Sequence, residues 1–202
     1  MKKILTTAIL CAGLVGFTAC DSFLDEDPKS SLTLDTYYKT SADIIGNVNY
    51  LYRDGAPDKM GNMTGAYRGS SLSVMNMVTG YFVNEYEGQE VDCSYARQLT
   101  RQDFTQSCCN YLTNDTWKSC YKSINVANAV IKYVDGVEMD NQAQYKAEAR
   151  FFRALNYFYL VKMFGDVPMI TEPTEDATLV EYPARTAASE VYKTVIIPDL
   201  QF

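Results

Sequence analysis

The chain has 202 residues, of which 47% are hydrophobic and 21% charged, and its formal net charge is −7. This length and balance predict one globular domain with a hydrophobic core, and the acidic charge argues against nucleic acid and anionic lipid surfaces as partners. The chain has no histidine, the commonest general base and metal ligand, which argues against most hydrolase chemistry.

Residues 1–19 are predicted to be a signal peptide. Lys2 and Lys3 form its charged start, and "ILTTAILCAGLVGF" forms its apolar centre. This run is shorter than the ~20 apolar residues that a membrane-spanning helix needs. The tripeptide "FTA" directly before Cys20 resembles a bacterial lipobox, in which the cysteine is acylated and becomes the mature N-terminus. The alternative is an ordinary secretory signal followed by a chance cysteine.

Residues 20–39 are predicted to be the lipidated cysteine and an acidic tether. The stretch "DSFLDEDPKSS" combines several carboxylates, which oppose collapse, with a stiffening proline. A flexible tether cannot hold carboxylates in a fixed geometry. We therefore interpret these acids as solvated and not as a catalytic or calcium-binding cluster.

The helical pattern begins after the tether, in a predicted domain that covers residues 40–202. Thr40 and Asp43 have the spacing of a capping box, and the helix that follows is expected to end at the Asp-Gly pair 54–55. A second run, "SLSVMNMVTGYF" at 71–82, also has helical apolar spacing.

A third helix is predicted to begin at Asp115, which can serve as its N-cap. Apolar residues then recur at helical spacing. They are Trp117, Tyr121, Ile124, Ile131 and Val134.

The strongest helical pattern covers residues 141–165. Its apolar residues form two stripes, which predicts packing on two sides, as in stacked helix pairs. Gly165 is expected to provide a left-handed stop, and Pro168 to prevent continuation. One stripe is Tyr145, Ala149, Phe152, Leu155 and Tyr159, and the other is Phe151, Ala154, Phe158 and Val161.

A final helix is predicted from about Ala187 to Pro198. No stretch shows a convincing alternation of apolar and polar residues, so no strand is expected. The predicted fold class is therefore all-α, with one long irregular segment near residues 83–114.

Two blocks of the chain resemble a known family. They are "WKSCYKSINVANAVI" at 117–131 and "AEARFFRALNYFYLVKMFGDVP" at 147–168, and Cys20 with "DSFLDEDP" adds to them. Together they resemble the N-terminal part of the SusD/RagB family, the lipid-anchored outer-membrane nutrient binders of Bacteroidetes. The resemblance runs from Cys20 to Phe202 and implies tetratricopeptide-like helix pairs.

The resemblance also implies a function. Family members are exposed on the outer membrane, pair with a TonB-dependent transporter of the SusC type, and bind oligosaccharides or peptides without enzymatic chemistry. In family members the helix pairs serve as scaffold and as the surface that faces the transporter. Arg150 and Arg153 in the second block are therefore expected to connect helices and not to bind a ligand. An oligosaccharide is favoured over the peptides of RagB-like proteins only because it is the more frequent ligand.

In the family, part of the ligand-contacting surface precedes the helix that opens with Trp117. Sugar binding needs aromatic rings to stack on sugar faces and polar or cationic groups to bond with hydroxyls. The candidates of these types in this segment are Tyr86, Tyr95, Arg97, Asn110 and Tyr111. The tryptophans expected for a starch-like ligand are absent, and Trp117 is interpreted as a core residue.

The cysteines after Cys20 leave two readings open. A bridge from Cys93, or from the adjacent Cys108 and Cys109, to Cys120 would staple the long loop of an exported protein; free buried thiols are the alternative. Adjacent cysteines without histidine do not have a standard zinc spacing, and no metal or cofactor is expected.

Family members continue well beyond Phe202, where much of their ligand-contacting surface lies. We therefore expect residues 40–202 to be an incomplete domain, whether through a fragment, a truncated gene or a shortened gene model. The second reading of function is a truncated helical interaction module without nutrient binding. An enzyme using paired carboxylates is the least favoured reading, because no acid pair has a supporting partner on a rigid element.

Overall fold

The computed structural model describes residues 33–55, 78–81, 98, 100–103, 107–174 and 183–202. The predicted signal peptide, Cys20 and most of the tether lie outside these residues. One compact unit covers Leu34–Phe202 and is distinct from Met1–Thr33.

The compact unit begins earlier than predicted. Helix α2 (Leu34–Tyr37) and the buried Tyr38 both fall within the predicted tether. The Tyr38 ring stacks on Tyr133 with 5.2 Å between centroids and 5° between planes, which anchors this part of the chain. The tether boundary at residue 39 is therefore wrong, because burial of Tyr38 holds residues 34–39 on the helical unit.

Helix α3 (Ser41–Asp54) confirms the predicted capping box. The Thr40 N–H donates to Asp43 Oδ2 at 2.8 Å, and the Thr40 hydroxyl donates to the same oxygen at 2.7 Å. These hydrogen bonds lower the pKa of the exposed Asp43 carboxyl, because they favour its charged form. Gly55 follows the last helical residue, and its N–H closes the final turn on the Leu51 carbonyl at 2.9 Å.

Helix α6 (Ser107–Tyr133) starts before the predicted cap, and a short 3-10 turn, η3 (Val134–Gly136), follows it. The predicted irregular segment 83–114 is therefore helical from residue 107, and Asp115 lies inside α6. No glycine or proline interrupts residues 107–133, so nothing in the chain ends the helix near Asp115.

The run at 71–82 is described only at residues 78–81. Residues 78–80 form a turn, in which Gly80 has a positive φ of 78°, and the Tyr81 side chain is 89% exposed. The predicted helix is therefore wrong at its C-terminal end, because Gly80 takes up a left-handed conformation there.

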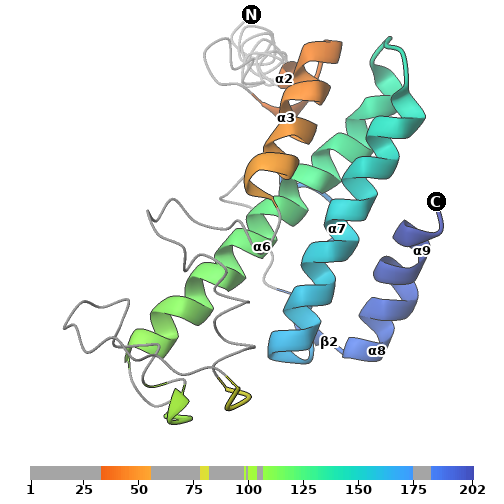
Figure 1. Ribbon diagram of the computed structural model, residues 1–202. Coiled ribbons are helices and arrows are strands. Elements are labelled where there is room, and N and C mark those ends of the chain that lie inside the picture. Colours follow the sequence, from red (N-terminus) through yellow and green to blue (C-terminus); the bar gives the residue numbers. More distant parts are fainter. Residues whose placement is uncertain (1–32, 56–77, 82–97, 99, 104–106, 175–182) are drawn as a thin grey trace, which may run out of the picture. The chain divides into compact units, whose positions relative to one another are not determined.

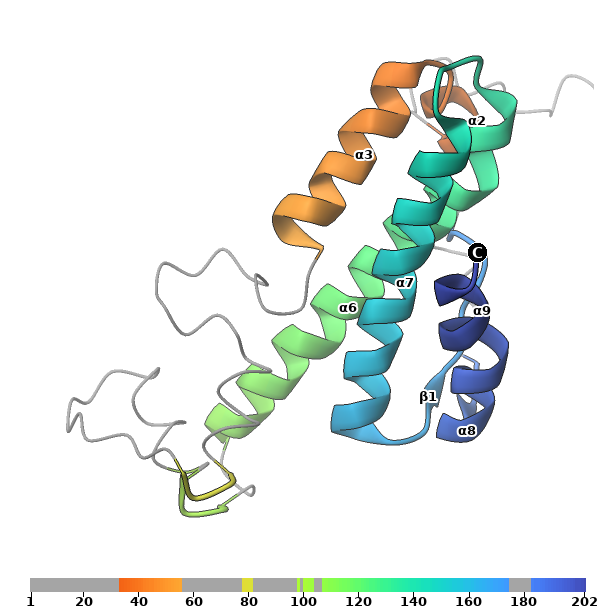
Figure 2. The same cartoon turned by 45° about the vertical axis from the view of Figure 1, so that its right-hand side comes forward.

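Helix α7 (Gln142–Phe164) runs antiparallel beside α6, as Figures 1 and 2 show. Its predicted packing on two sides is confirmed, since α3 and α6 contact it on one side and the C-terminal helices on another. The stripes differ in detail: Phe151 and Phe158 are exposed, whereas Arg153 and Asn156 are buried. The buried Asn156 amide donates to the Gly55 carbonyl at 2.8 Å and so ties α7 to the end of α3.

A two-residue strand pair follows α7, although no alternating pattern predicted it. Strand β1 (Val167–Pro168) pairs antiparallel with β2 (Arg185–Thr186), with Val167 opposite Thr186. Such short pairing is set by the position of the helices and leaves no periodicity in the sequence. Most of the described residues are helical, so the predicted all-α class is confirmed.

The C-terminal segment is helical beyond its predicted end. It consists of α8 (Ala188–Val191), a π-helical turn η5 (Tyr192–Ile196) and α9 (Ile197–Leu200). Pro198 lies in the first turn of α9, after the wide π turn, where its missing N–H costs no hydrogen bond. Pro198 therefore does not stop the helix.

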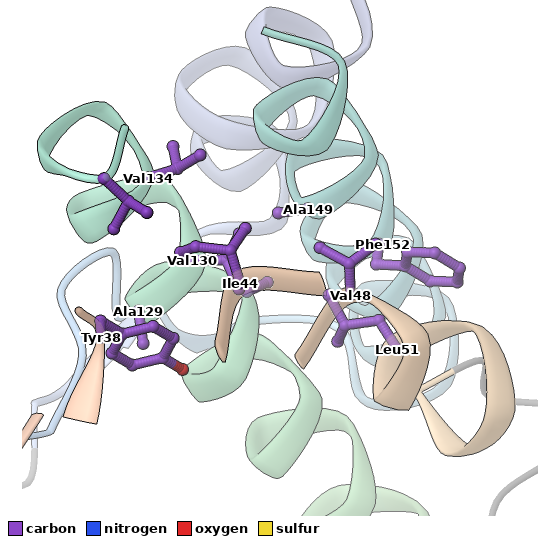
Figure 3. Packing of buried hydrophobic residues seen from close by; sticks show 11 residues of the cluster. Tyr38, Ile44, Val48, Leu51, Ala129, Val130, Val134, Ala149 and Phe152 are labelled. Carbon is purple, nitrogen blue, oxygen red and sulfur yellow. The ribbon is translucent and has the colours of Figure 1, made fainter. Parts of the chain in front are cut away.

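Two groups of buried apolar side chains hold the unit together. Figure 3 shows the first, in which Ile44, Val48 and Leu51 of α3 meet α6 and α7. The second joins α6, α7, β1 and the C-terminal helices through residues such as Leu160, Val167 and Val195. Helix α7 contributes to both, which is why its sequence is apolar on two sides.

Replacing Gly165 with Ala is expected to destabilise the fold by about 1–3 kcal/mol, because φ 69° and ψ −123° are strained for a residue with a Cβ. The control is Gly46→Ala, inside α3, where no atom lies within 4 Å of an added Cβ. That change is expected to stabilise by up to ~1 kcal/mol. Urea unfolding of both variants measures the contrast, and equal effects would contradict it.

Candidate functional site

The structure describes only part of the predicted ligand-binding set. Tyr86, Tyr95 and Arg97 lie outside the described residues. Asn110 and Tyr111 lie near the start of α6, within a helix and not in the irregular segment that the sequence predicted. Asn110 precedes Trp117 by about two helical turns, so these two positions share one face of α6.

Trp117 lies at the centre of an aromatic group at this end of α6. Its ring packs edge-on against Phe164 of α7 at 5.1 Å and lies tilted against Tyr121 at 5.0 Å between centroids. Trp117 is half-buried, so the prediction that it is a core residue holds for only part of its surface. Two aromatic neighbours fix its ring while part of it reaches solvent.

The short strand pair brings Arg185 to this aromatic group. The Arg185 Cζ lies 5.5 Å from the Trp117 ring centroid, and its Nη1 donates to the Asp166 carbonyl oxygen at 2.6 Å. The Asp166 carboxylate accepts the Ala188 N–H at 2.9 Å through Oδ1. Sequence reasoning missed Arg185 and Asp166, because only the pairing of β1 with β2 brings Arg185 to Trp117 and to its hydrogen-bond partner Asp166.

Tyr121 connects the aromatic group to β1. Its hydroxyl donates to the Pro168 carbonyl oxygen at 2.7 Å. Burial raises the pKa of Tyr121 well above its usual value, and the nearby Tyr157 hydroxyl adds to the rise. Tyr121 is therefore a neutral hydrogen-bond donor that fixes the strand, and it does not act as an acid or base near neutral pH.

A buried ionic network lies near the middle of α7, around Arg153. Arg153 binds Asp199 of α9 through two hydrogen bonds, from Nε to Oδ2 at 2.7 Å and from Nη2 to Oδ1 at 2.8 Å. Its Nη1 also donates to Asn128 Oδ1 of α6 at 2.9 Å. The Asp199 side chain is only 3% exposed. This network joins three helices, which confirms that Arg153 pairs helices.

Arg150 has the same role in a more exposed setting. Its Nη1 lies 3.9 Å from Asp199 Oδ1, and its Cζ lies 4.0 Å from the Phe202 ring centroid. Both contacts join α7 to the C-terminal segment, as the sequence predicted for this residue. Sequence reasoning missed Asp199, because a single acid near Pro198 carries no signal of burial.

Cys120 is a free, buried thiol, so the structure favours the free-thiol alternative at this position. Burial raises the pKa of the Cys120 thiol to about 12. Within the described ranges, no group of three or more potential metal ligands lies together. None of the helices searched there has the length and apolar character to cross a membrane.

We expect the stability advantage of wild type over Cys120→Ala to shrink as the pH rises from about 9 to about 12. The thiol ionises near 9 in the unfolded chain but only near 12 in the fold, so the unfolded state loses its proton first. The contribution of Cys120 is therefore complete below pH 9 and lost toward pH 12. Urea unfolding of both proteins at pH 8, 10 and 11.5 measures this difference, and a constant value would contradict it.

Comparison with known proteins adds a family match. A family model for SusD-like proteins, described as starch-binding and associating with the outer membrane, matches residues 22–201. No solved structure matches the chain.

Several curated proteins are similar to the chain over nearly all of its length. SusD-like protein P2 of Formosa agariphila is 29% identical over 100% of this chain and 37% of its own length. SusD-like protein P25 of the same organism is 27% identical over 91% of this chain and 34% of its own. A SusD-like protein of Bacteroides ovatus is 27% identical over 98% of this chain and 33% of its own. The chain thus spans about a third of the length of these relatives.

Proposed function

The chain belongs to the SusD-like family described as starch-binding and associating with the outer membrane, and from this membership we propose that it is a cell-surface binding lipoprotein for oligosaccharides. It would capture its ligand without chemistry and deliver it to a TonB-dependent transporter. The observation that carries this proposal is the family match over residues 22–201, together with the all-α fold of paired helices.

The proposed ligand surface includes the start of α6 and the segment before it. Its residues are Tyr86, Tyr95, Arg97, Asn110 and Tyr111, chosen because aromatic and polar side chains suit sugar rings and hydroxyls. Trp117 and Tyr121, two members of the aromatic group, lie on the same helix and support a ligand surface at this end of α6.

Affinity electrophoresis through gels that contain soluble starch, xylan or laminarin tests the proposal. Wild-type protein is expected to be retarded by at least one polysaccharide, and Tyr86→Ala and Tyr95→Ala are expected to move faster. Tyr52→Ala, a half-exposed aromatic residue of α3, serves as the control. Unretarded migration of well-folded wild type in every gel would overturn glycan capture and favour the peptide-binding or interaction-module reading.

The membrane anchor is proposed to be lipid on Cys20. Acyl chains contribute ~0.8 kcal/mol per buried methylene, and two or more chains hold a protein stably in a membrane. Cys20→Ala is expected to abolish labelling with a fatty-acid analogue and to release the protein from the membrane fraction. A variant that stays fully membrane-bound would contradict this anchor.

The transporter partnership rests on family membership alone. Affinity purification of tagged protein from detergent-solubilised outer membranes is expected to recover a TonB-dependent transporter. Purification of the protein without such a transporter would contradict the partnership. Glycan binding is tested separately, by affinity electrophoresis.

A further inference from the structure

The surface of Trp117 combines features that helix packing alone does not require. Trp117 is the one tryptophan of the chain, and two aromatic neighbours hold its ring in a fixed, half-buried position. A ring that served the core alone would be enclosed, as Tyr157 is. Part of the indole surface instead remains exposed to solvent.

The guanidinium of Arg185 lies over this ring without sealing it. The distance from Arg185 Cζ to the Trp117 centroid is 5.5 Å, whereas Arg150 stacks on the Phe202 ring at 4.0 Å. Carbon atoms in full contact lie about 3.5–4.0 Å apart, so Arg185 is not in close contact across the ring face. An exposed arginine over an aromatic ring contributes only about 0.5–1 kcal/mol, so a small rearrangement of Arg185 costs little.

Arg185 lies over the ring, and Asp166 lies next to Arg185, so groups of both charges meet at this corner of the unit. Arg185 donates one hydrogen bond to the Asp166 carbonyl oxygen, and its other N–H groups have no partner among the described residues. The Asp166 carboxylate accepts the Ala188 N–H through Oδ1, and within the same described part of the chain its Oδ2 accepts nothing. Among the described residues the site therefore offers donors and an acceptor without a hydrogen-bond partner, and its two formal charges cancel.

We propose that Trp117, Arg185 and Asp166 form a subsite for one neutral pyranose unit of the glycan. One face of a pyranose ring carries C–H groups that pack on the indole, and its hydroxyls bond with the guanidinium and the carboxylate. Because the charges of Arg185 and Asp166 cancel, the site gives a sugar carboxylate no net attraction to offset the cost of desolvating it, which favours a neutral sugar over a uronic acid. This inference rests on the proposed function and names part of its ligand surface.

The emission of the single tryptophan gives a direct test with the purified protein. Maltoheptaose, xylohexaose and laminarihexaose are titrated separately, and tryptophan emission is recorded. The oligosaccharide whose polysaccharide retards the protein in gels is expected to shift or quench the Trp117 emission with saturation. Polygalacturonic acid oligomers are expected to leave the emission unchanged.

Substitutions at the polar residues separate the subsite from the rest of the ligand surface. Arg185→Met and Asp166→Asn are expected to weaken binding at least tenfold, with unchanged urea unfolding midpoints, because both side chains are exposed. Tyr52→Ala is the control and should bind as wild type does. Trp117→Ala is avoided as the main variant, because loss of its packing on Phe164 perturbs the fold.

The outcomes distinguish the subsite from the proposed function. Retardation in gels with unchanged Trp117 emission, or with wild-type affinity in both polar variants, would overturn the subsite while glycan binding stands. Absence of both retardation and emission change for every glycan would overturn glycan binding by this chain and the subsite with it.

Discussion

Replacing Asp199 with Asn is expected to lower the free energy of unfolding by about 3–5 kcal/mol, because it leaves the buried charge of Arg153 uncompensated. Both carboxylate oxygens of Asp199 accept hydrogen bonds from Arg153, and the Asp199 side chain is 3% exposed. The same network joins α6, α7 and α9 through Asn128. The substitution should therefore also increase hydrogen exchange in residues 197–200 more than elsewhere.

A matched control comes from the exposed ion pair between Lys146 and Asp135. The Asp135 side chain is 65% exposed, and Asp135→Asn is expected to cost at most about 1 kcal/mol, as for other surface pairs. The double variant Arg153→Met/Asp199→Leu should recover part of the loss, since no buried charge remains. Equal small effects of Asp199→Asn and Asp135→Asn would contradict the structural role of the buried pair.

Replacing Leu51 with Ala is expected to cost about 2–5 kcal/mol, because it leaves a cavity where α3 packs on α6 and α7. Leu51 is fully buried and belongs to the first core group together with Val48 and Phe152 (Figure 3). Its loss removes apolar contacts from both neighbouring helices. Chemical unfolding followed by far-ultraviolet circular dichroism measures the change.

The control for this cavity is Leu200→Ala, the same chemical change at a side chain that is 58% exposed. Surface substitutions of this kind usually change stability by about 0.5 kcal/mol or less. A Leu51→Ala variant as stable as Leu200→Ala would show that α3 does not pack on α6 and α7 as described.

Features set by neighbouring residues could be predicted from the sequence. The capping box of Thr40 and Asp43, the stop at Gly165 and the two-sided packing of α7 depend on spacing within one helix. Each of these features is therefore visible in the spacing of residues within a short stretch of sequence. The all-α class follows from the same helical spacing.

Features set by distant residues could not be predicted. Asp199 is buried because Arg153, far away in the chain, supplies its partner, and no local pattern marks that pairing. The early start of α6 was missed because Asp115 resembles a cap even where the helix continues through it. The π turn before Pro198 likewise has no sequence signal, although it is what lets the helix pass the proline.

The candidate site likewise contains residues that the local sequence can suggest and residues that only distant contacts bring together. Residue type and family resemblance predicted candidates in an irregular segment before Trp117, of which Asn110 and Tyr111 fall instead within α6. Arg185 reaches Trp117 and Asp166 only through the pairing of β1 with β2. Such a convergence depends on how the helices place two short strands, which the sequence does not encode locally.

Equilibrium dialysis against labelled oligosaccharides, with the length of the recovered glycan determined, is the decisive test of glycan binding without chemistry. We expect saturable retention of an oligosaccharide from the series that retards the protein in gels, recovered at its original length. Retention with shortened products would contradict a binding protein without chemistry, and absence of retention for every oligosaccharide would contradict glycan binding itself.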